Sequence, residues 1–551
     1  MSFSYDAKDE KGIGTPIHEE VQPARAVEYE LGHTGQGKAT IRTMKPRHIQ
    51  LIGIGGAIGT GLFVGTGTSL SNAGPLSLVL GYAIYGALVL ATFNAMGEMT
   101  SYLPVDGSIL VFASRFVDPS YGFAMAWLCF WNNSITVAAE ATAVASIIKF
   151  WNEDVNSGVW CAIFVVSILM INMWGSRYFG EAEFWFSTFK VILVFIIMAF
   201  TFVTMLGGNP HKDRYGFRYW KNPGAMREYL VPGNLGRFLG FWSVFIQAAF
   251  AYGGPDMIAM TAGEARYPRR VLPNVFNRVI FRLLFFYIGG TFCIGTLVPY
   301  TDPNLTGNGG KGTPPIVIGA DRLNVPVLPH IINAIILTSA WSAGCCLTFT
   351  ASRNLYAAAI NGHAPRLFLK SFRGVPINSI IAVVVVSCLS FMTVSDKAIS
   401  VFTWITNILG GMWILNLWLQ NVLYLRFRAG CDAQGIDRST FPYKRRGQRL
   451  MSWICVFAYG IIFLTNGFKV FMKGRWNIAD FLFGYLVLGL FIALFLIHKT
   501  WSVLKNGGKW RWLHGDEMDF TAGKKEIDED EKTYPVVGNS RGARFERWLW
   551  G

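Results

Sequence analysis

Three ionisable side chains stand out because they lie within long apolar stretches of this 551-residue chain. Lys190 follows the letters EAEFWFSTF, Glu140 lies in NNSITVAAEATAVA, and Asp256 ends the letters YGGPD. An ionisable group is expensive inside an apolar membrane segment and is by default a candidate for binding a proton, an ion or a charged ligand.

Each of the three also has a structural alternative. Lys190 can exchange a proton, because burial disfavours the charged form of a lysine, or it can extend to the membrane surface. Glu140 is a candidate to bind a proton or a cationic substrate, or it is a protonated glutamate that bonds a neighbouring helix. Asp256 is a candidate ligand contact, or it caps the helix that follows it. The sequence leaves these alternatives open.

The stretch LIGIGGAIGTGLFVG, residues 51–65, is apolar enough for a membrane span, yet it is rich in glycine. Glycine costs about 1 kcal/mol relative to alanine inside a helix. One explanation is close packing of helices, which small residues four apart permit. The other is a broken helix, in which freed backbone N–H and C=O groups face a cavity.

A second stretch, FIQAAFAYGGPDMIAM, carries a similar signal much later in the chain. Proline removes a backbone donor and disfavours helix at the residue before it. Two interrupted segments in corresponding positions are the best sequence indication of an inverted-repeat transporter and of its substrate site. We therefore predict two broken helices, one near Ile58 and one near Gly253.

The composition places these stretches in a lipid bilayer. Hydrophobic residues make up 52% and charged residues 15% of the chain, whereas a soluble protein carries about 25% charged residues. The net charge of +15 does not indicate nucleic-acid binding, because most lysines and arginines lie between apolar segments rather than in one basic patch. No spacing of the eight cysteines resembles a metal site, so neither a metal nor another cofactor is expected.

Twelve apolar segments are predicted to span the membrane. They lie at about 49–70, 76–102, 121–149, 158–176, 184–206, 237–261, 277–299, 327–359, 376–395, 399–425, 451–472 and 478–499. Tails of residues 1–46 and 503–551 flank them and look solvated and at least partly disordered. Both tails are expected to be cytoplasmic, because the short loops on that side carry most of the arginines and lysines.

Five stretches closely resemble the amino-acid permeases of fungal plasma membranes, which belong to the amino acid–polyamine–organocation superfamily. They are GIGGAIGTGLFVGTG, GEMTSYLPVDGSILVFASRFVDPSYGFAMAW, EAEFWFSTFKVILV, TAGEARYPRRVLPNVFNRVIFR and ASRNLYAAAINGHAPR, and the resemblance covers roughly residues 45–500. It implies an all-α membrane protein of the leucine-transporter type, with a five-plus-five inverted repeat, broken helices 1 and 6, and two extra helices.

On this resemblance, the transmembrane permease domain is residues 47–502, with repeats at about 49–206 and 237–425 and with helices 11 and 12 at about 451–499. The implied activity is secondary active, proton-coupled amino-acid uptake at the plasma membrane by alternating access. The proton would be the coupling ion, the substrate would be an amino acid, and no enzyme activity is expected. The tails would be available to trafficking or ubiquitination machinery.

The resemblance also implies where an amino acid would bind. Backbone N–H groups at the start of the outer half-helix, with the Thr60 hydroxyl, would hold the substrate carboxylate, because a helix N-terminus is positive. Carbonyls on the other side of each break would accept from the ammonium group. The implied substrate-binding residues are Ala57, Ile58, Gly59, Thr60, Gly61, Phe250, Ala251, Tyr252, Gly253 and Asp256. Phe250 and Tyr252 would shape the side-chain pocket, unless they only pack between helices.

Lys190 matches, by motif, a lysine that replaces the sodium ion in proton-coupled members of the superfamily, and related permeases often carry a glutamate at Glu140. Both are therefore implied proton-coupling residues. Many relatives carry Thr-Glu where this chain has Pro255 and Asp256. That departure means that the substrate of any one relative does not transfer directly to this chain.

Two further glutamates are expected to form ion pairs of an inner gate. Glu98 lies near the inner end of span 2, and Glu264 lies at the inner end of span 6. The expected partners are Arg115, Arg269 and Arg270, with Arg353 as a further member.

Other functions remain as alternatives. A permease for choline, GABA or polyamines would use the same fold, and a non-transporting amino-acid sensor would bind without carrying. A membrane enzyme is disfavoured, because the sequence has no nucleophile–base–acid set, no metal-ligand cluster and no phosphate loop.

Overall fold

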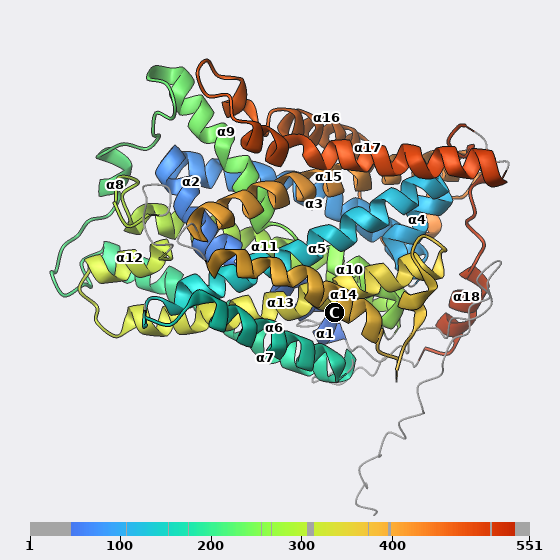
Figure 1. Cartoon of the computed structure of the whole chain (residues 1–551), viewed down its shortest axis with the longest axis horizontal. Helices are drawn as coiled ribbons and strands as arrows, with labels where there is room; N and C mark the ends of the chain where they lie inside the picture. Colours follow the sequence, from blue (N-terminus) through green and yellow to red (C-terminus); the bar gives the residue numbers. More distant parts are fainter. Residues whose placement is uncertain are drawn as a thin grey trace, which may run out of the picture.

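The computed structural model describes residues 46–105, 107–152, 154–174, 176–254, 256–265, 267–305, 313–372, 374–394, 398–506 and 510–534. This part of the chain is all-helical (Figure 1). Pro255 and the tail residues 1–45 and 535–551 lie outside the described residues.

Six helices are long and apolar enough to cross a membrane. They are α3 (Pro75–Tyr102), α7 (Ser176–Met205), α11 (Pro268–Leu297), α13 (Leu328–Ile360), α15 (Ala398–Ala433) and α17 (Ile478–Asn506). Shorter apolar helices are α6 (Ser157–Met173), α14 (Ile377–Ser387), which continues as η5 (Cys388–Val394), and α16 (Gln448–Leu464). α5 (Pro119–Ile148) has 30 residues and so exceeds the length needed for a span, but Asn132, Asn133 and Glu140 make it more polar.

Two further segments are helices with a break in the middle. α1 (Pro46–Ala57) stops at a bend over residues 58–59, and helix then resumes as a π-helical turn, η1 (Gly61–Gly65), that runs directly into α2 (Thr66–Ala73). α9 (Gly233–Ala251) is separated from α10 (Asp256–Met260) by non-helical residues. Gly254 has φ of 108°, a conformation that favours glycine. Both interruptions lie where glycine and proline predict them.

Helix ends depart from the predicted spans at several places, including α11, which begins at Pro268 rather than near residue 277, and α17, which ends at Asn506 rather than near residue 499. Two further departures are in α7 and α15. α7 begins at Ser176 rather than near residue 184, and α15 ends at Ala433 rather than near residue 425. In both helices the extra turns carry charged residues such as Glu181 and Arg428, so hydropathy alone ends the span before the helix ends.

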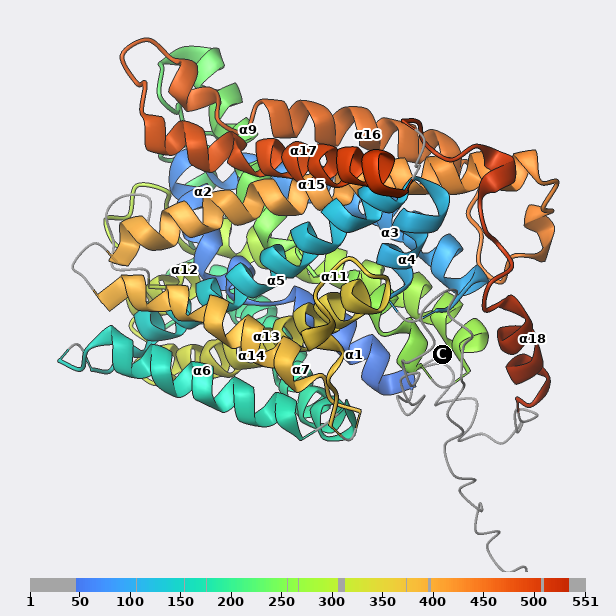
Figure 2. The same ribbon diagram turned by 45° about the vertical axis from the view of Figure 1, so that its right-hand side comes forward.

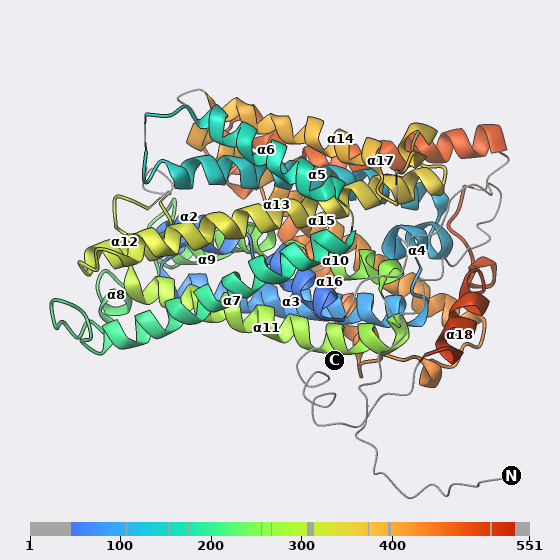
Figure 3. The same cartoon turned by 90° about the horizontal axis from the view of Figure 1, so that it is seen from below.

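Short helices lie at the two ends of the helical bundle (Figures 1 and 3). α8 (Arg218–Lys221) and α12 (Pro315–Arg322) lie at one end, here called the α8 end. α4 (Ser108–Phe116) and α18 (Lys524–Lys532) lie at the opposite end, here called the α4 end. Single 3-10 turns fill the connections: η2 (Ala262–Glu264), η4 (Arg366–Leu369), η6 (Arg438–Thr440), η7 (Phe468–Phe471) and η8 (Gly515–Glu517).

The inner and outer helices differ in how much apolar surface they bury. α16 and α17 lie along one side of the bundle and α6 along the opposite side (Figures 1 and 2). In the most apolar part of α17 only 17% of the residues are buried, against 78% in α15. An extensive exposed apolar face is costly in water but is the surface that lipid requires.

The described part of the C-terminal tail packs against the α4 end of the bundle. Met518, Phe520 and Ile527 are buried, and Leu513 N–H donates to the backbone carbonyl of Val117 at 3.0 Å. The tail was expected to be solvated and partly disordered. Residues 510–534 instead form a strap, because their few apolar side chains find a matching surface on the bundle.

Candidate functional site

The break in the first helix is met by opposite charges on its two sides. On the α1 side, the carbonyl of Gly55 accepts a hydrogen bond from Lys190 Nζ, and the carbonyl of Ile58 accepts from Ser339 Oγ at 3.1 Å. On the η1 side, Thr60 N–H donates to Glu140 Oε1 at 3.2 Å and lies 3.4 Å from Oε2. A cation therefore faces a helix C-terminus and an anion faces a helix N-terminus, which is the favourable arrangement for both dipoles.

Close approach of the Glu140 carboxylate depends on Gly59. A Cβ at residue 59 would lie 2.4 Å from Glu140 Oε1 and 3.3 Å from the Cβ of Ala343. Thr60 is 1% exposed, and its hydroxyl has no hydrogen-bond partner among the described residues. The site therefore holds one used backbone donor and one unused side-chain donor side by side.

Asp256 lies at the second break, as the first residue of α10. Its Oδ2 accepts a hydrogen bond from Asn416 Nδ2 on α15 at 3.2 Å, while its buried Oδ1 has no hydrogen-bond partner among the described residues. Cys129 on α5 donates to the Oδ1 of Asn416 at 3.4 Å. Asp256 thus lies in the first turn of α10, where a carboxylate favours the helix N-terminus, and it ties α10 to α15.

The residues before the second break divide into two groups. Phe250 and Gly253 face the first break, and Gly253 packs so closely on Trp413 that a Cβ there would lie 2.4 Å from Cε2 of the indole.

Tyr252 points away from the first break and toward α3, where its hydroxyl donates to the carbonyl of Tyr82 at 3.1 Å. The carbonyl of Ala251 is already bonded to the hydroxyl of Tyr287 on α11.

A small central cavity lies between the two breaks. Ten residues line it: Gly56, Gly59, Gly61, Thr136, Glu140, Phe250, Ala251, Gly253, Leu347 and Trp413. It admits about one water molecule. Of the predicted site residues, Thr60 and Lys190 reach the break through hydrogen bonds rather than through the cavity wall, Tyr252 and Asp256 do not line it, and the Ala57 side chain lies outside the described residues.

Sequence reasoning missed Glu183, which lies on the same helix as Lys190. Its carboxylate is buried and contacts Ser342 Oγ at 2.6 and 2.8 Å and Ser187 Oγ at 2.7 Å. It interacts electrostatically with Lys190, as Glu140 does. The spacing of seven residues between Glu183 and Lys190, which places both side chains on one helix face, was the sequence signal that could have identified Glu183.

Trp413 and Asn416 were also missed, and no local sequence pattern marks them.

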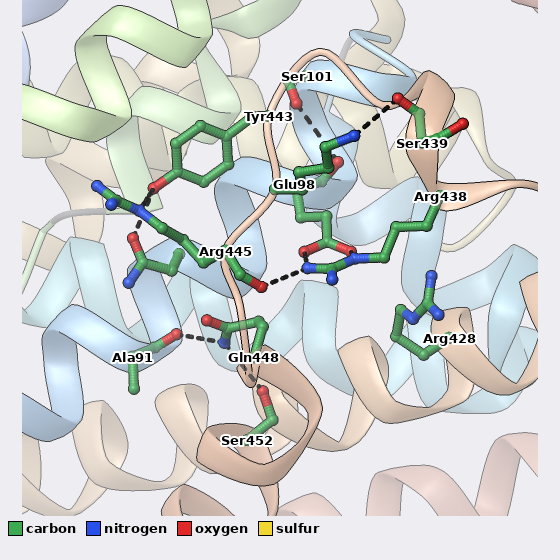
Figure 4. A network of polar contacts seen from close by, with 12 residues as sticks. Ala91, Glu98, Ser101, Arg428, Arg438, Ser439, Tyr443, Arg445, Gln448 and Ser452 are labelled. Carbon is green, nitrogen blue, oxygen red and sulfur yellow. Dashed lines mark hydrogen bonds and ion pairs between the residues drawn. The ribbon is translucent and has the colours of Figure 1, made fainter.

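A polar network joins α3 to the loop that follows α15 (Figure 4). Glu98 on α3 is fully buried, and both of its oxygens lie 2.7 Å from the guanidinium of Arg438 in the loop after α15. The same guanidinium donates to the carbonyl of Arg445 at 2.6 Å, and Arg445 reaches Asn277 on α11 at 2.5 Å. This loop therefore locks α3 to α11.

The expected ion-pair partners need correction. Glu98 pairs with Arg438 and not with Arg115, Arg269 or Arg270, because the loop after α15 folds back over α3. Arg115 donates instead to the carbonyl of Ala522, and Arg269 pairs with Asp528 and Glu531 of the strap, at 2.6 and 2.7 Å.

Glu264 pairs with Arg353 at 3.2 Å. This pair is nearly buried, and the guanidinium of Arg353 also stacks over the ring of Phe349 at 3.5 Å.

Within the described residues, no cluster of His, Cys, Asp and Glu is suited to hold a metal ion. All eight cysteines are free, and only Cys388 is exposed. The arrangement is thus one of backbone donors, backbone acceptors and buried charges, which suits binding of a small zwitterion and movement of a proton rather than covalent chemistry.

Comparison with known proteins gives one family and one fold. Residues 48–506 match the family described as Amino acid permease. A proline-specific permease of Emericella nidulans is 39% identical over 90% of this chain and 91% of its own, and one of Saccharomyces cerevisiae is 38% identical over 89% and 79%. A dicarboxylic amino acid permease of Saccharomyces cerevisiae is 37% identical over 89% of this chain and 81% of its own. The Eremococcus coleocola manganese transporter shares the fold, with a TM-score of 0.54 at 13% identity over 83% of this chain and 94% of its own.

Proposed function

The chain belongs to the amino acid permease family, and we propose that it imports amino acids together with protons across the plasma membrane by alternating access. Its relatives are transporters rather than enzymes. The chain is a multi-pass membrane protein that transports amino acids, because its family consists of amino-acid permeases and because it has several helices that are long and apolar enough to cross a membrane.

One observation carries the proposed substrate site. At residues 58–59 the helix opens inside the bundle, and its backbone groups are met by charged or polar side chains rather than by helix. The N–H and hydroxyl of Thr60 would hold the carboxylate of the amino acid, and carbonyls at the end of α9 would accept from its ammonium group. Phe250 and Trp413 would enclose a side chain, and the two proline-specific relatives favour a compact, neutral one such as that of proline.

Proton coupling is assigned to Lys190 and Glu140, with Glu183 as a third member. Lys190 bonds the carbonyl of Gly55 at the end of α1, so a change in its charge acts directly on the inner half-helix. Loss of a proton from Lys190 would remove a cation from the negative end of α1 and loosen that contact. The amino-acid site and the proton site would thus share one helix.

The proposed topology has twelve spans. The six long apolar helices, the three shorter ones, α5 and the two interrupted segments together supply that number. The spans up to α7 would form one repeat and those from α9 to α15 an inverted second repeat, followed by α16 and α17. We assign the α4 end, with both tails, to the cytoplasm and the α8 end to the outside.

Uptake by the purified full chain in proteoliposomes tests the proposal. Each of the twenty amino acids is offered with the outside at pH 5 or pH 7.5, with and without an uncoupler. We expect saturable uptake of small neutral amino acids that rises at acidic outside pH and collapses with the uncoupler. Uptake that ignores the pH gradient would contradict proton coupling, and binding without uptake would favour a sensor.

Two further arms address the substrate site. Choline, GABA and polyamines should compete poorly, because they lack an α-carboxylate for the Thr60 donors. Thr60→Val should lose at least about 90% of uptake, since one buried hydrogen bond to a charged group contributes about 1.5–3 kcal/mol, while the amount of protein reconstituted in the vesicles stays unchanged. Strong competition by choline would instead favour the alternative permease.

A further inference from the structure

We infer that the Glu140 carboxylate and the carboxylate of the transported amino acid compete for the same backbone donor, the N–H of Thr60. The inference rests on the proposed function, which places the substrate carboxylate at Thr60. It adds an order of events, because the Glu140 side chain must leave the donor before an amino acid is held there.

The geometry of Glu140 is that of an anion bound at a helix start. Thr60 N–H lies 3.2 and 3.4 Å from the two carboxylate oxygens, and the helix that begins there continues without a break through η1 and α2 to Ala73. The carboxylate reaches this donor across Gly59, where a Cβ would lie 2.4 Å from Oε1. An incoming carboxylate would have to approach the same N–H by the same opening.

A second donor at the same place distinguishes the two competitors. The Thr60 hydroxyl is buried beside the Glu140 carboxylate, but no hydrogen bond of good geometry joins it to that carboxylate or to any other described residue. A free amino acid is not tethered to α5 and can place its carboxylate against both the N–H and the hydroxyl. The substrate thus gains a bond that Glu140 does not make, which lets it displace a tethered competitor.

Both carboxylates cannot occupy the site together. The central cavity admits about one water molecule, and two carboxylates at van der Waals distance repel strongly away from bulk water. Occupation by the substrate therefore requires that Glu140 turns away, becomes neutral, or does both.

A proton supplies the switch. When Glu140 binds a proton from the outer solution, a new O–H bond forms on one carboxyl oxygen, and the bond from Thr60 N–H weakens because the acceptor is no longer charged. The N–H then donates to the substrate carboxylate, and one positive charge enters with each zwitterion. Two titratable groups interact electrostatically with Glu140, Lys190 from α7 and Tyr287 from α11, while α13 and α15 present Ala343 and Trp413.

Binding of radiolabelled L-proline to the purified full chain in detergent, from pH 5 to pH 8, tests the competition. L-Proline does not titrate in this range, so any slope belongs to the protein. The wild type should bind at least about tenfold more weakly at pH 8 than at pH 5, the effect of losing one charged hydrogen bond. Glu140→Gln should bind at pH 8 as tightly as the wild type does at pH 5, with little slope. The competition is refuted if Glu140→Gln keeps the wild-type slope or binds more weakly at every pH.

A measurement on the wild type alone guards against a misfolded variant. L-Prolinol carries a hydroxymethyl group in place of the carboxylate, so it does not compete with Glu140 for Thr60, and its ammonium group is attracted by the charged form of Glu140. Its binding should be weaker than that of L-proline at pH 5 and should not fall between pH 5 and pH 8. The same slope for L-prolinol and L-proline overturns the competition. If the wild type binds none of the twenty amino acids at any pH, the proposed function fails as well.

Discussion

Gly61 is the residue at which one added methyl group tests the broken first helix most directly. A Cβ at residue 61 would lie 2.7 Å from the Cα of Ala251, which is backbone and cannot turn aside. At Gly65, one turn further on, the nearest atom would be Gln247 Oε1 at 3.2 Å, the end of a flexible side chain. The two glycines therefore form a matched pair.

Gly61→Ala should reduce uptake at least about tenfold, because forcing a methyl group into a tight contact costs about 1–3 kcal/mol and shifts η1 away from α9. Gly65→Ala should stay within about twofold of the wild type, since the Gln247 side chain can move at small cost. Initial uptake rates, divided by surface protein, give the comparison. Equal loss in both variants would mean that general helix crowding, and not the η1–α9 contact, is responsible.

Glu183 offers a test of charge at the same break. Glutamine in its place still accepts from Ser187 and Ser342, but Lys190 loses a buried anionic partner. A buried charge without a partner is costly, so Glu183→Gln should lower proton-driven accumulation at least about tenfold while Glu183→Asp keeps part of it. Exchange of internal for external substrate, which needs no net proton movement, should fall much less. Equal loss of accumulation and exchange would assign Glu183 to folding instead.

At this site, local sequence features predict the helix break and the buried charges but not their packing partners. The break at residues 58–59 was predicted because glycine acts on the chain locally, and Glu140 and Lys190 were found because charge is rare in apolar segments. Trp413 and Asn416 were not found, since their contacts with Gly253 and Asp256 join elements about 160 positions apart. Packing partners at such separations leave no periodic pattern in one sequence.

Among elements, the loop after α15 depends on one buried ion pair. Glu98 is fully buried and Arg438 is 29% exposed, and the two form a bidentate contact (Figure 4). Removing one member of a buried pair leaves an uncompensated charge. The sequence predicted a pair for Glu98 but not this partner, which lies 340 positions later.

Arg438→Gln should lower the free energy of unfolding by about 2–3 kcal/mol, the buried-pair cost reduced for partial exposure. The double variant with Glu98→Gln should lose less than the sum of the single variants, because the pair acts as a unit. Asp213→Asn, which breaks an exposed pair with Arg218, is the control and should cost about 0–1 kcal/mol. Thermal unfolding in detergent measures all four proteins, and additive losses would argue against the pair.

The junction of α5, α13 and α17 contains a pH-sensitive residue. His363 follows α13, and its ring lies 3.1 Å from Ser114 Oγ and packs beside Phe123 and His498. Burial, and then the neighbouring His498, lowers the pKa of His363 to about 4. The unfolded histidine, with a pKa of about 6.5, binds a proton at a pH where the folded one does not, so stability falls as the pH drops from about 6.5 towards about 4.

At pH 5 this group should cost about 2 kcal/mol of stability relative to pH 7.5. His363→Asn should therefore flatten part of the fall in unfolding temperature between these pH values. His211→Gln, at an exposed histidine bonded to Asn324, should retain the wild-type fall. An unchanged pH profile in His363→Asn would rule out this histidine as a source of the pH dependence.

For the whole molecule, the C-terminal strap links parts of the bundle that are distant in sequence. It contacts α4 through Phe116, α15 through Phe427, and the start of α11 through Arg269. Composition predicted a solvated tail, because acidic and basic residues dominate it. A few apolar residues at the right positions were enough to dock it, and their target surface exists only in the folded bundle.

Phe520 is one of the buried anchors of the strap. Its ring lies 4.7 Å from that of Phe116 and 5.6 Å from that of Phe427, and the side chain is 3% exposed. Phe520→Ala should therefore lower the free energy of unfolding by about 3 kcal/mol, at the low end for a buried phenylalanine because the site is peripheral. Trp510, which is 61% exposed, is the matched control, and Trp510→Ala should stay within about 0.5 kcal/mol of the wild type.

The strap also makes a prediction about transport that stability alone does not. Because it joins α4, α11 and α15 across the α4 end, its release should ease separation of these helices, the movement by which that end would open. Phe520→Ala should then raise the rate of substrate exchange per surface molecule by about twofold or more, the effect of removing a fraction of a kcal/mol from an opening step. If exchange falls in proportion to the stability lost, the strap serves folding and does not restrain opening.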